Sequence, residues 1–367
     1  MANLELLRCV AMMMVVVLHF LGKGNLLADL SGERLGSTGM AAWLLECFCI
    51  VAVNVYMLIS GYFLCMTSFK LSRLLGLWFQ VWIYSVGIGL LAWATGIYPA
   101  QDFSIHYLLT LALPVSMGHY WFLTAYTFLY LLLPLFGAAV RNMNRQQMQT
   151  VLGLLLLAFC ILKSILPARL EMDGKGYDCL WYLCVFLTAA YIRRFGWDFL
   201  QKKGCAFFLY LAGVTAIFCG TMGLRQIYLH TGSLEHIVKI CIEYNHILPL
   251  LASVGLFGVF LNLRVSGTFA KAVNHIAPYT LGVYLLHENL GVRYAWQKWL
   301  GAEKVKGAGS LLLWTAVAVI CVFAAGILID MVRAWVLEKL QGLLMKSVPF
   351  RYAAERIRAV DELFRIS

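Results

Sequence analysis

The sequence contains few charged side chains and few prolines for its length. Charged residues make up 13% of the 367 positions, hydrophobic residues make up 62%, and only 7 prolines are present. A soluble globular domain carries about a quarter charged residues, which keep its surface hydrated. Together with a mean hydropathy of +0.80, this shortage of charge excludes an ordinary soluble protein and indicates a polytopic membrane protein.

Other signals are also missing. No basic segment followed by a small-residue cleavage site accompanies the first apolar stretch, so we expect a retained transmembrane helix and not a cleaved signal peptide. The 11 cysteines form no pair of facing CxxC elements, so we interpret them as apolar packing residues and expect no metal. The net charge of +11 suits contact with membrane lipid headgroups or phosphorylated ligands. It is not combined with exposed aromatics in a nucleic-acid pattern, and we expect no nucleic-acid partner.

Ten apolar segments are long enough, or nearly long enough, to cross a bilayer. They predict an all-α fold, a polytopic membrane helical bundle with about ten transmembrane helices, and residues 105–115 are expected to form a short re-entrant or interfacial piece. The expected spans are residues 4–22, 42–65, 74–97, 118–137, 150–166, 179–192, 204–222, 244–262, 275–292 and 310–332.

Ten spans place both ends of the chain on the same side of the membrane. The two alternating sets of connections carry equal numbers of lysines and arginines, but one set is about half as long, and the basic C-terminal segment lies on its side. The positive-inside rule therefore favours cytoplasmic termini in an inner membrane. We expect an integral-membrane domain over residues 1–338 and a basic cytoplasmic tail over residues 339–367, solvated or lying on the membrane surface.

The first apolar stretch contains Arg8 and His19. At about 100° per residue, eleven steps return to within roughly 20° of the same helix face, and the two positions lie about 16 Å apart along the axis. Met12 and Val15 fall on the same stripe. Because ionisable groups are costly in lipid, Arg8 and His19 must face the protein interior or a wet cavity, and they are the first functional candidates.

Two further groups of candidates lie in and after the second span. Asn54 either packs against neighbouring helices through a hydrogen bond or contacts a substrate. Glu46 is a candidate partner for an internal cation. Lys70 and Arg73 stand one helical turn apart in the next connection, where they either satisfy the positive-inside rule or bind a phosphate-bearing ligand.

The fourth and ninth spans supply the remaining candidates. Tyr120 and Trp121 open the fourth span, where an aromatic belt at the membrane interface and a sugar-stacking edge are both possible roles. His287 and Glu288 form a titratable pair near the outer end of the ninth span. A structural histidine and a catalytic one are equally compatible with that position.

Taken together, these residues resemble the membrane-bound acyltransferase family 3, the integral-membrane O-acyltransferases of bacterial surface carbohydrates. Arg8 and His19 match the Arg-x10-His signature of that family in the first helix. Arg73 is followed by Gly76, where family members often carry a second arginine, so Lys70 and Arg73 are the matching pair one turn earlier. The other matching segments are residues 59–63 (ISGYF), 120–123 (YWFL), 130–134 (YLLLP) and 282–289 (GVYLLHEN).

The resemblance implies transfer of an acetyl group from cytoplasmic acetyl-CoA to a hydroxyl of a glycan or a lipid-linked sugar. A sugar hydroxyl is a poor nucleophile, and His19 is the candidate base because histidine titrates near neutral pH. Arg8 would then neutralise CoA groups or hold a carboxylate such as Glu46, and Lys70 with Arg73 would bind the nucleotide phosphates. The pair His287 and Glu288 would orient His19 or bind the acceptor, and Tyr120, Trp121 and Asn54 are acceptor-site candidates.

The main competing class is a transporter or flippase of a lipid-linked sugar, in which the same buried charges would act as a gate or proton relay. The sequence shows no inverted repeat, which is the usual mark of such transporters. A sensor or structural membrane protein would not need Arg8 and His19 on one stripe. The Arg-x10-His signature favours the acyltransferase, working by direct transfer or by a covalent acyl-enzyme relay.

Overall fold

The computed structural model describes residues 1–32, 34–166 and 173–365, and these residues form helices and connections without a β-strand. The predicted all-α class is therefore confirmed. Seven helical segments of the described chain are long and apolar enough to cross a membrane, and a bent pair of helices raises the number to eight. The expected number of ten is not confirmed.

Two of the expected spans account for the difference. The helix α10 (Cys179–Phe195) has 17 residues and falls just short of a full span. The expected span over residues 275–292 is instead divided into α14 (Gly267–Ile276), a 3-10 turn (Ala277–Tyr279) and α15 (Thr280–His287). Pro278 lies at this break, where its missing N–H removes one helical hydrogen bond.

The chain divides into two compact units. Unit 1 comprises residues 1–63, 143–277 and 297–321, and unit 2 comprises residues 64–142, 278–296 and 322–367. The helix α17 (Ala308–Leu344) contributes its first part to unit 1 and its second part to unit 2. The expected boundary at residue 338 falls inside this helix, which ends at Leu344.

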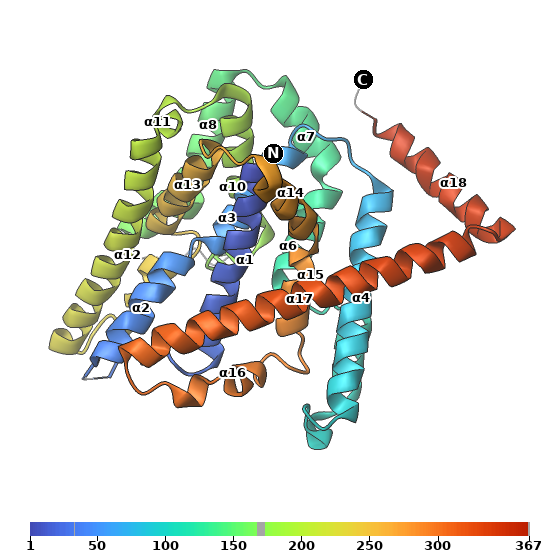
Figure 1. The fold of residues 1–367 in the computed structure, drawn as a ribbon. Coiled ribbons are helices and arrows are strands. Elements are labelled where there is room, and N and C mark those ends of the chain that lie inside the picture. The colour runs from blue at the N-terminus through green and yellow to red at the C-terminus, as the bar shows by residue number, and fades with distance from the viewer. Residues whose placement is uncertain (33, 167–172, 366–367) are drawn as a thin grey trace. The chain divides into compact units, whose positions relative to one another are not determined.

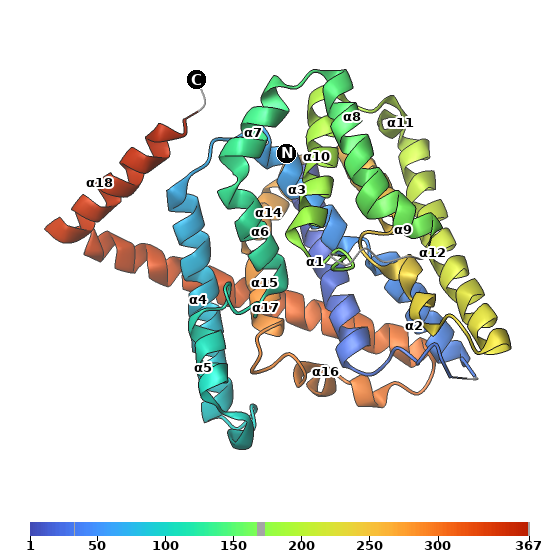
Figure 2. The same cartoon turned by 180° about the vertical axis from the view of Figure 1, so that it is seen from behind.

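Unit 1 is built around α12 (Lys203–Thr231) and α13 (Ile247–Leu261), which run side by side (Figures 1 and 2). Small residues permit this contact: a Cβ on Gly255 would lie 2.5 Å from the backbone nitrogen of Tyr210, and one on Gly213 would lie 2.7 Å from the Cβ of Ala252. The helix α1 packs against α2, α13 and α14. The other helices of unit 1 are α1 (Ala2–Lys23), α2 (Ser37–Cys49), α3 (Ala52–Leu64), α8 (Arg145–Leu156), α9 (Leu162–Ile165), α11 (Asp198–Gln201) and α16 (Trp296–Trp299), together with α10 and α14.

Unit 2 is built around α4, with α5 beside it (Figure 2). The hydroxyl of Tyr107 on α5 donates to the carbonyl oxygen of Gly89 on α4 at 3.0 Å. The helices α6 and α7 form the bent pair, with an angle of 60°, and Pro134 follows the bend directly. The helices that lie wholly in unit 2 and precede or follow α15 are α4 (Leu71–Ala94), α5 (Ile105–Ala112), α6 (Trp121–Leu131), α7 (Leu133–Asn142) and α18 (Val348–Leu363). The short α5 lies within the segment expected to be re-entrant or interfacial.

Candidate functional site

Arg8 and His19 lie on one uninterrupted helix, α1. The Nη1 atom of Arg8 is 2.7 Å from the Oε2 atom of Glu5, one helical turn away. The Arg8 and Glu5 side chains are 28% and 22% exposed, so this ion pair is accessible at one end of α1. Arg8 thus pairs with Glu5, whereas one carboxylate oxygen of the expected partner Glu46 is buried without a hydrogen bond.

His19 lies one turn before the C-terminal end of α1 and is partly buried. Its carbonyl oxygen accepts a hydrogen bond of 3.4 Å from the side-chain amide of Gln297. Gln297 belongs to unit 1, so this contact holds the Gln297 side chain at the His19 end of α1 within that unit. The sequence did not identify Gln297, because a single glutamine 278 positions away from His19 carries no local signal.

Asn54 is fully buried in unit 1. Its amide nitrogen donates to the carbonyl oxygen of Tyr244 at 2.8 Å, and its amide oxygen accepts from the indole N–H of Trp181 at 2.9 Å. These contacts join α3 to α10 and to the segment before α13. Of the two roles considered for Asn54, the structure provides the packing contacts.

Lys70 and Arg73 are exposed at the N-terminal end of α4. The backbone N–H of Lys70 donates to the hydroxyl of Tyr130 at 3.1 Å. The helix α18 packs beside them, because the hydroxyl of Ser72 donates to the Oδ2 atom of Asp361 at 2.5 Å. Because both side chains remain exposed, the two cations are accessible to a ligand.

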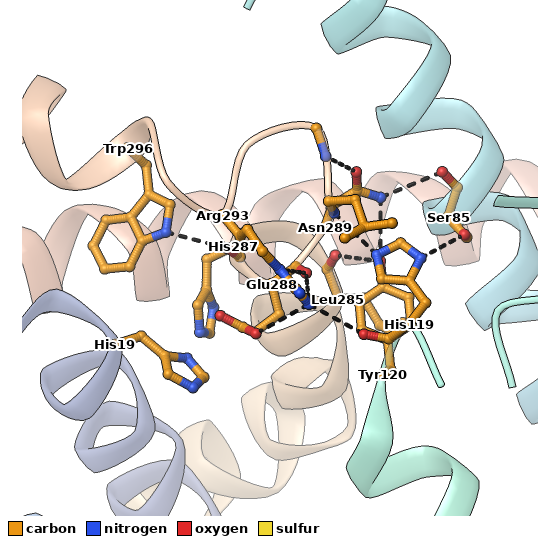
Figure 3. A network of polar contacts seen from close by, with 12 residues as sticks. His19, Ser85, His119, Tyr120, Leu285, His287, Glu288, Asn289, Arg293 and Trp296 are labelled. Atoms are coloured by element: carbon orange, nitrogen blue, oxygen red, sulfur yellow. Dashed lines mark hydrogen bonds and ion pairs between the residues drawn. The ribbon is translucent and has the colours of Figure 1, made fainter. Parts of the chain in front are cut away.

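The turn after α15 contains a dense network of hydrogen bonds in unit 2 (Figure 3). The side-chain amide of Asn289 donates to the carbonyl oxygen of Tyr84 at 3.0 Å and to the hydroxyl of Tyr120 at 3.2 Å. Its amide oxygen accepts from the backbone N–H of Gly291 at 2.9 Å. The hydroxyl of Tyr120 donates to the carbonyl oxygen of Leu285 at 3.0 Å. Tyr120 is therefore a buried scaffold residue of this turn, and its neighbour Trp121 is only partly buried.

His119 fixes the same turn and has a defined tautomer. Its Nε2 atom accepts from the backbone N–H of Leu290 at 3.0 Å, so in the neutral ring Nδ1 carries the hydrogen and donates to the Ser85 hydroxyl at 3.0 Å. His119 precedes α6 and lies outside the candidate spans. Burial lowers the pKa of His119 to about 3, and the Arg293 guanidinium acts in the same direction. Both ring nitrogens of His119 are thus used in holding the turn.

His287 and Glu288 are buried at the end of α15. The Nδ1 atom of His287 is 2.6 Å from the carbonyl oxygen of Val283, and since a carbonyl only accepts, Nδ1 must donate there. In a neutral His287 ring, Nε2 is therefore the basic nitrogen. The Nη2 atom of Arg293 is 3.4 Å from the Glu288 carboxylate, and it also donates to the carbonyl oxygen of His119 at 3.1 Å.

A second buried polar cluster in unit 2 surrounds Asp330 on α17. Its carboxylate is fully buried and forms a bidentate pair with Arg333 at 2.6 and 3.0 Å. It also accepts from the hydroxyl of Tyr84 and the amide of Gln80, both at 3.0 Å. The sequence did contain a signal for this cluster: an acidic and a basic residue three positions apart at the end of an apolar segment.

These observations define the class of protein as a polytopic helical membrane protein with ionisable side chains inside its bundle. A family model described as an acyltransferase domain matches residues 1–331. The chain therefore belongs to the membrane-bound acyltransferase family 3 and is a multi-pass membrane acyltransferase. The comparisons with curated proteins and with solved structures gave no match.

Proposed function

We propose that this acyltransferase moves an acetyl group from cytoplasmic acetyl-CoA to a hydroxyl of a cell-surface glycan. The acceptor is a capsular polysaccharide or exopolysaccharide, or its lipid-linked precursor, and the protein works in the bacterial inner membrane with both termini in the cytoplasm. The observation that carries the proposal is the family match, which includes Arg8 and His19 on the continuous helix α1.

The proposed reaction needs a base with a pKa near neutrality. His19 removes the proton of the acceptor hydroxyl while the hydroxyl oxygen attacks the thioester carbonyl carbon. Collapse of the tetrahedral intermediate breaks the C–S bond, and the departing CoA thiolate takes the proton back from the His19 imidazolium. The products are an acetyl ester and free CoA, so atoms and protons balance without a metal or a further reactant.

The cationic residues are assigned to the donor. Lys70 and Arg73 are exposed and would bind the nucleotide phosphates of CoA. Arg8 is partly exposed and already paired with Glu5, so it would exchange or share that partner when it contacts the pantetheine carbonyl groups or a phosphate. His287 and Glu288 are assigned to the acceptor.

The test uses purified protein in detergent with acetyl-CoA and surface polysaccharide from the source cells that has been stripped of its esters by mild alkali. Mass spectrometry should detect acetyl groups on the polysaccharide, and equimolar free thiol should appear. His230→Ala, a change of an exposed histidine at the end of α12, is the matched control for His19→Ala. Absence of acetyl-CoA binding by the wild-type protein would overturn the proposal and favour a transporter.

A further inference from the structure

Unit 1 contains a cavity of about 600 Å³ that none of the functional residues discussed above lines. Ligand pockets for small molecules have volumes of roughly 300–1,000 Å³. The cavity lies beyond the C-terminal ends of α1 and α12, and seven of its nine lining residues are polar or charged. The lining residues are Asp29, Leu30, Ser31, Lys175, Glu235, His236, Val238, Lys239 and Glu243.

The walls of this cavity are fixed by packing and hydrogen bonds. Leu30 and Val238 form one hydrophobic cluster with Trp43. The indole N–H of Trp43 donates to the carbonyl oxygen of Ala28 at 2.9 Å, and the Nη2 atom of the Arg225 guanidinium donates to the carbonyl oxygen of Gly32 at 2.7 Å. The loop that follows α1 is thereby held in place on both sides of the lining residues.

A buried ion network supports the cavity beneath Glu243. The Nζ atom of Lys163 lies 2.6 Å from Glu243, 2.5 Å from Asp173 and 2.7 Å from the amide oxygen of Asn245. The amide nitrogen of Asn245 donates to Asp173 at 2.6 Å. Glu243 is only 8% exposed, and its other oxygen is 3.9 Å from the Nζ atom of Lys175. These ion pairs and hydrogen bonds hold the buried side chains in one arrangement.

The charges of the lining select the chemistry of the ligand. Asp29, Glu235 and Glu243 oppose Lys175 and Lys239, so the cavity has no excess of positive charge for a polyphosphate. Carboxylates only accept hydrogen bonds and ammonium groups only donate them, whereas each hydroxyl of a sugar does both. A polyhydroxylated ring can therefore pair with both kinds of group at once.

Two tyrosines lie close in the sequence to residues that line the cavity. Tyr177 comes two positions after Lys175, Tyr244 directly follows Glu243, and the two ring centroids are 4.9 Å apart. The Tyr177 side chain is 50% exposed. The Tyr244 ring is buried, at 7% exposed, so Tyr177 is the member of the pair that offers an apolar face with a polar edge to a sugar ring.

We propose that this cavity, the acceptor pocket, binds a sugar ring of the glycan that receives the acyl group, and this inference rests on the proposed function. The pocket belongs to the same unit as His19, and its first lining residue follows His19 by ten positions, beyond the same end of α1. Arg8 lies toward the other end of that helix. The acceptor therefore approaches α1 from the His19 end.

The test combines Lys239→Ala with Glu235→Gln, two changes of exposed lining residues that leave the buried network intact. The control combines Lys202→Ala with Glu303→Gln, exposed residues of unit 1 that do not line the cavity. Binding of alkali-treated surface polysaccharide to detergent-solubilised protein and binding of acetyl-CoA are measured separately, and the KM for each is determined.

We expect the pocket variant to bind the polysaccharide at least about tenfold more weakly and to raise its KM by a similar factor, with unchanged acetyl-CoA binding and kcat. Unchanged polysaccharide binding in the pocket variant, an equal loss in the control variant, or no polysaccharide binding by the wild type would overturn the acceptor pocket. If the wild type acetylates the polysaccharide and the pocket variant does so equally well, the pocket is refuted and the proposed function is retained. Wild-type protein that binds the polysaccharide but never acetylates it would refute the proposed function alone.

Discussion

The helix α1 and the turn after α15 hold their polar side chains in different ways. On α1, Arg8 and His19 are partly exposed, and Arg8 forms an ion pair with its neighbour Glu5 on the same helix. Asn289 lies in the turn and His119 bonds to it from the segment before α6; both are buried, and each bonds to residues far away in the sequence. The side chains of α1 are thus accessible ionisable groups, whereas those at the turn fix the backbone around His287 and Glu288.

This difference predicts two kinds of mutational effect. A partly exposed group on a helix contributes little to folding, so its replacement should change activity and leave stability unchanged. A buried, bonded group leaves unsatisfied partners behind when it is replaced, so its loss should reduce stability. Variants of His19, Asp330, Gly282 and His119 separate effects on activity from effects on stability.

The largest effect is expected for His19→Ala. Removal of a general base lowers the rate by about 10²–10⁴-fold, and we expect acetylation to be abolished while folding and membrane insertion are retained. Acetyl transfer and the thermal midpoint in detergent are measured together, with His230→Ala as the control. Retained acetylation by His19→Ala would show that another group deprotonates the acceptor.

Asp330→Asn is expected to have the largest effect on stability. Removing one member of a buried ion pair costs about 3–5 kcal/mol, because the remaining charge is left uncompensated. Glu362→Gln is the matched control, since Glu362 forms an exposed pair with Arg365 and such pairs contribute about 0–1 kcal/mol. The thermal midpoints of the two variants are measured in detergent. Equal midpoints would show that Asp330 does not stabilise unit 2.

The sequence was sufficient to predict the architecture and the first helix. Apolar segments at spanning length identified the membrane bundle, and the spacing of Arg8 and His19 predicted that both lie on α1. These predictions depend on local pattern alone. The helices α1, α4 and α12 begin and end within three residues of the expected spans, except that α12 ends nine residues later than expected.

The sequence was not sufficient to predict the turn after α15. The contacts of Asn289 with Tyr84 and Tyr120 join residues 205 and 169 positions apart, and no periodicity reports such pairs. The segment also counted as one apolar span because hydropathy does not register the break near Pro278. The cavity beside Glu243 was missed for the same reason, since its lining comes from three separate loops.

Gly282→Ala tests the close packing of α15 in unit 2. A Cβ on Gly282 would lie 2.4 Å from the Cβ of Asp330, so one of the two helices must move, at a cost of about 1–3 kcal/mol. Gly87→Ala on α4 is the control, because a Cβ there meets no atom within 4 Å and alanine favours a helix by about 1 kcal/mol over glycine. Opposite shifts of the thermal midpoint are expected, and a neutral Gly282→Ala variant would contradict the packing.

The smallest effect is a pH dependence of stability that arises from His119. Its pKa is about 3 in the folded protein and about 6.5 in an unfolded chain, so the unfolded state binds more protons between these values. The stability contributed by neutral His119 is therefore complete above pH 6.5 and decreases as the pH falls toward 3. At about 1.4 kcal/mol per pH unit, roughly 2 kcal/mol is lost by pH 5. The thermal midpoint of the wild type should fall more between pH 7.5 and pH 5 than that of His119→Gln, which cannot titrate. Parallel curves for the two proteins would mean that His119 does not hold the turn as a neutral side chain.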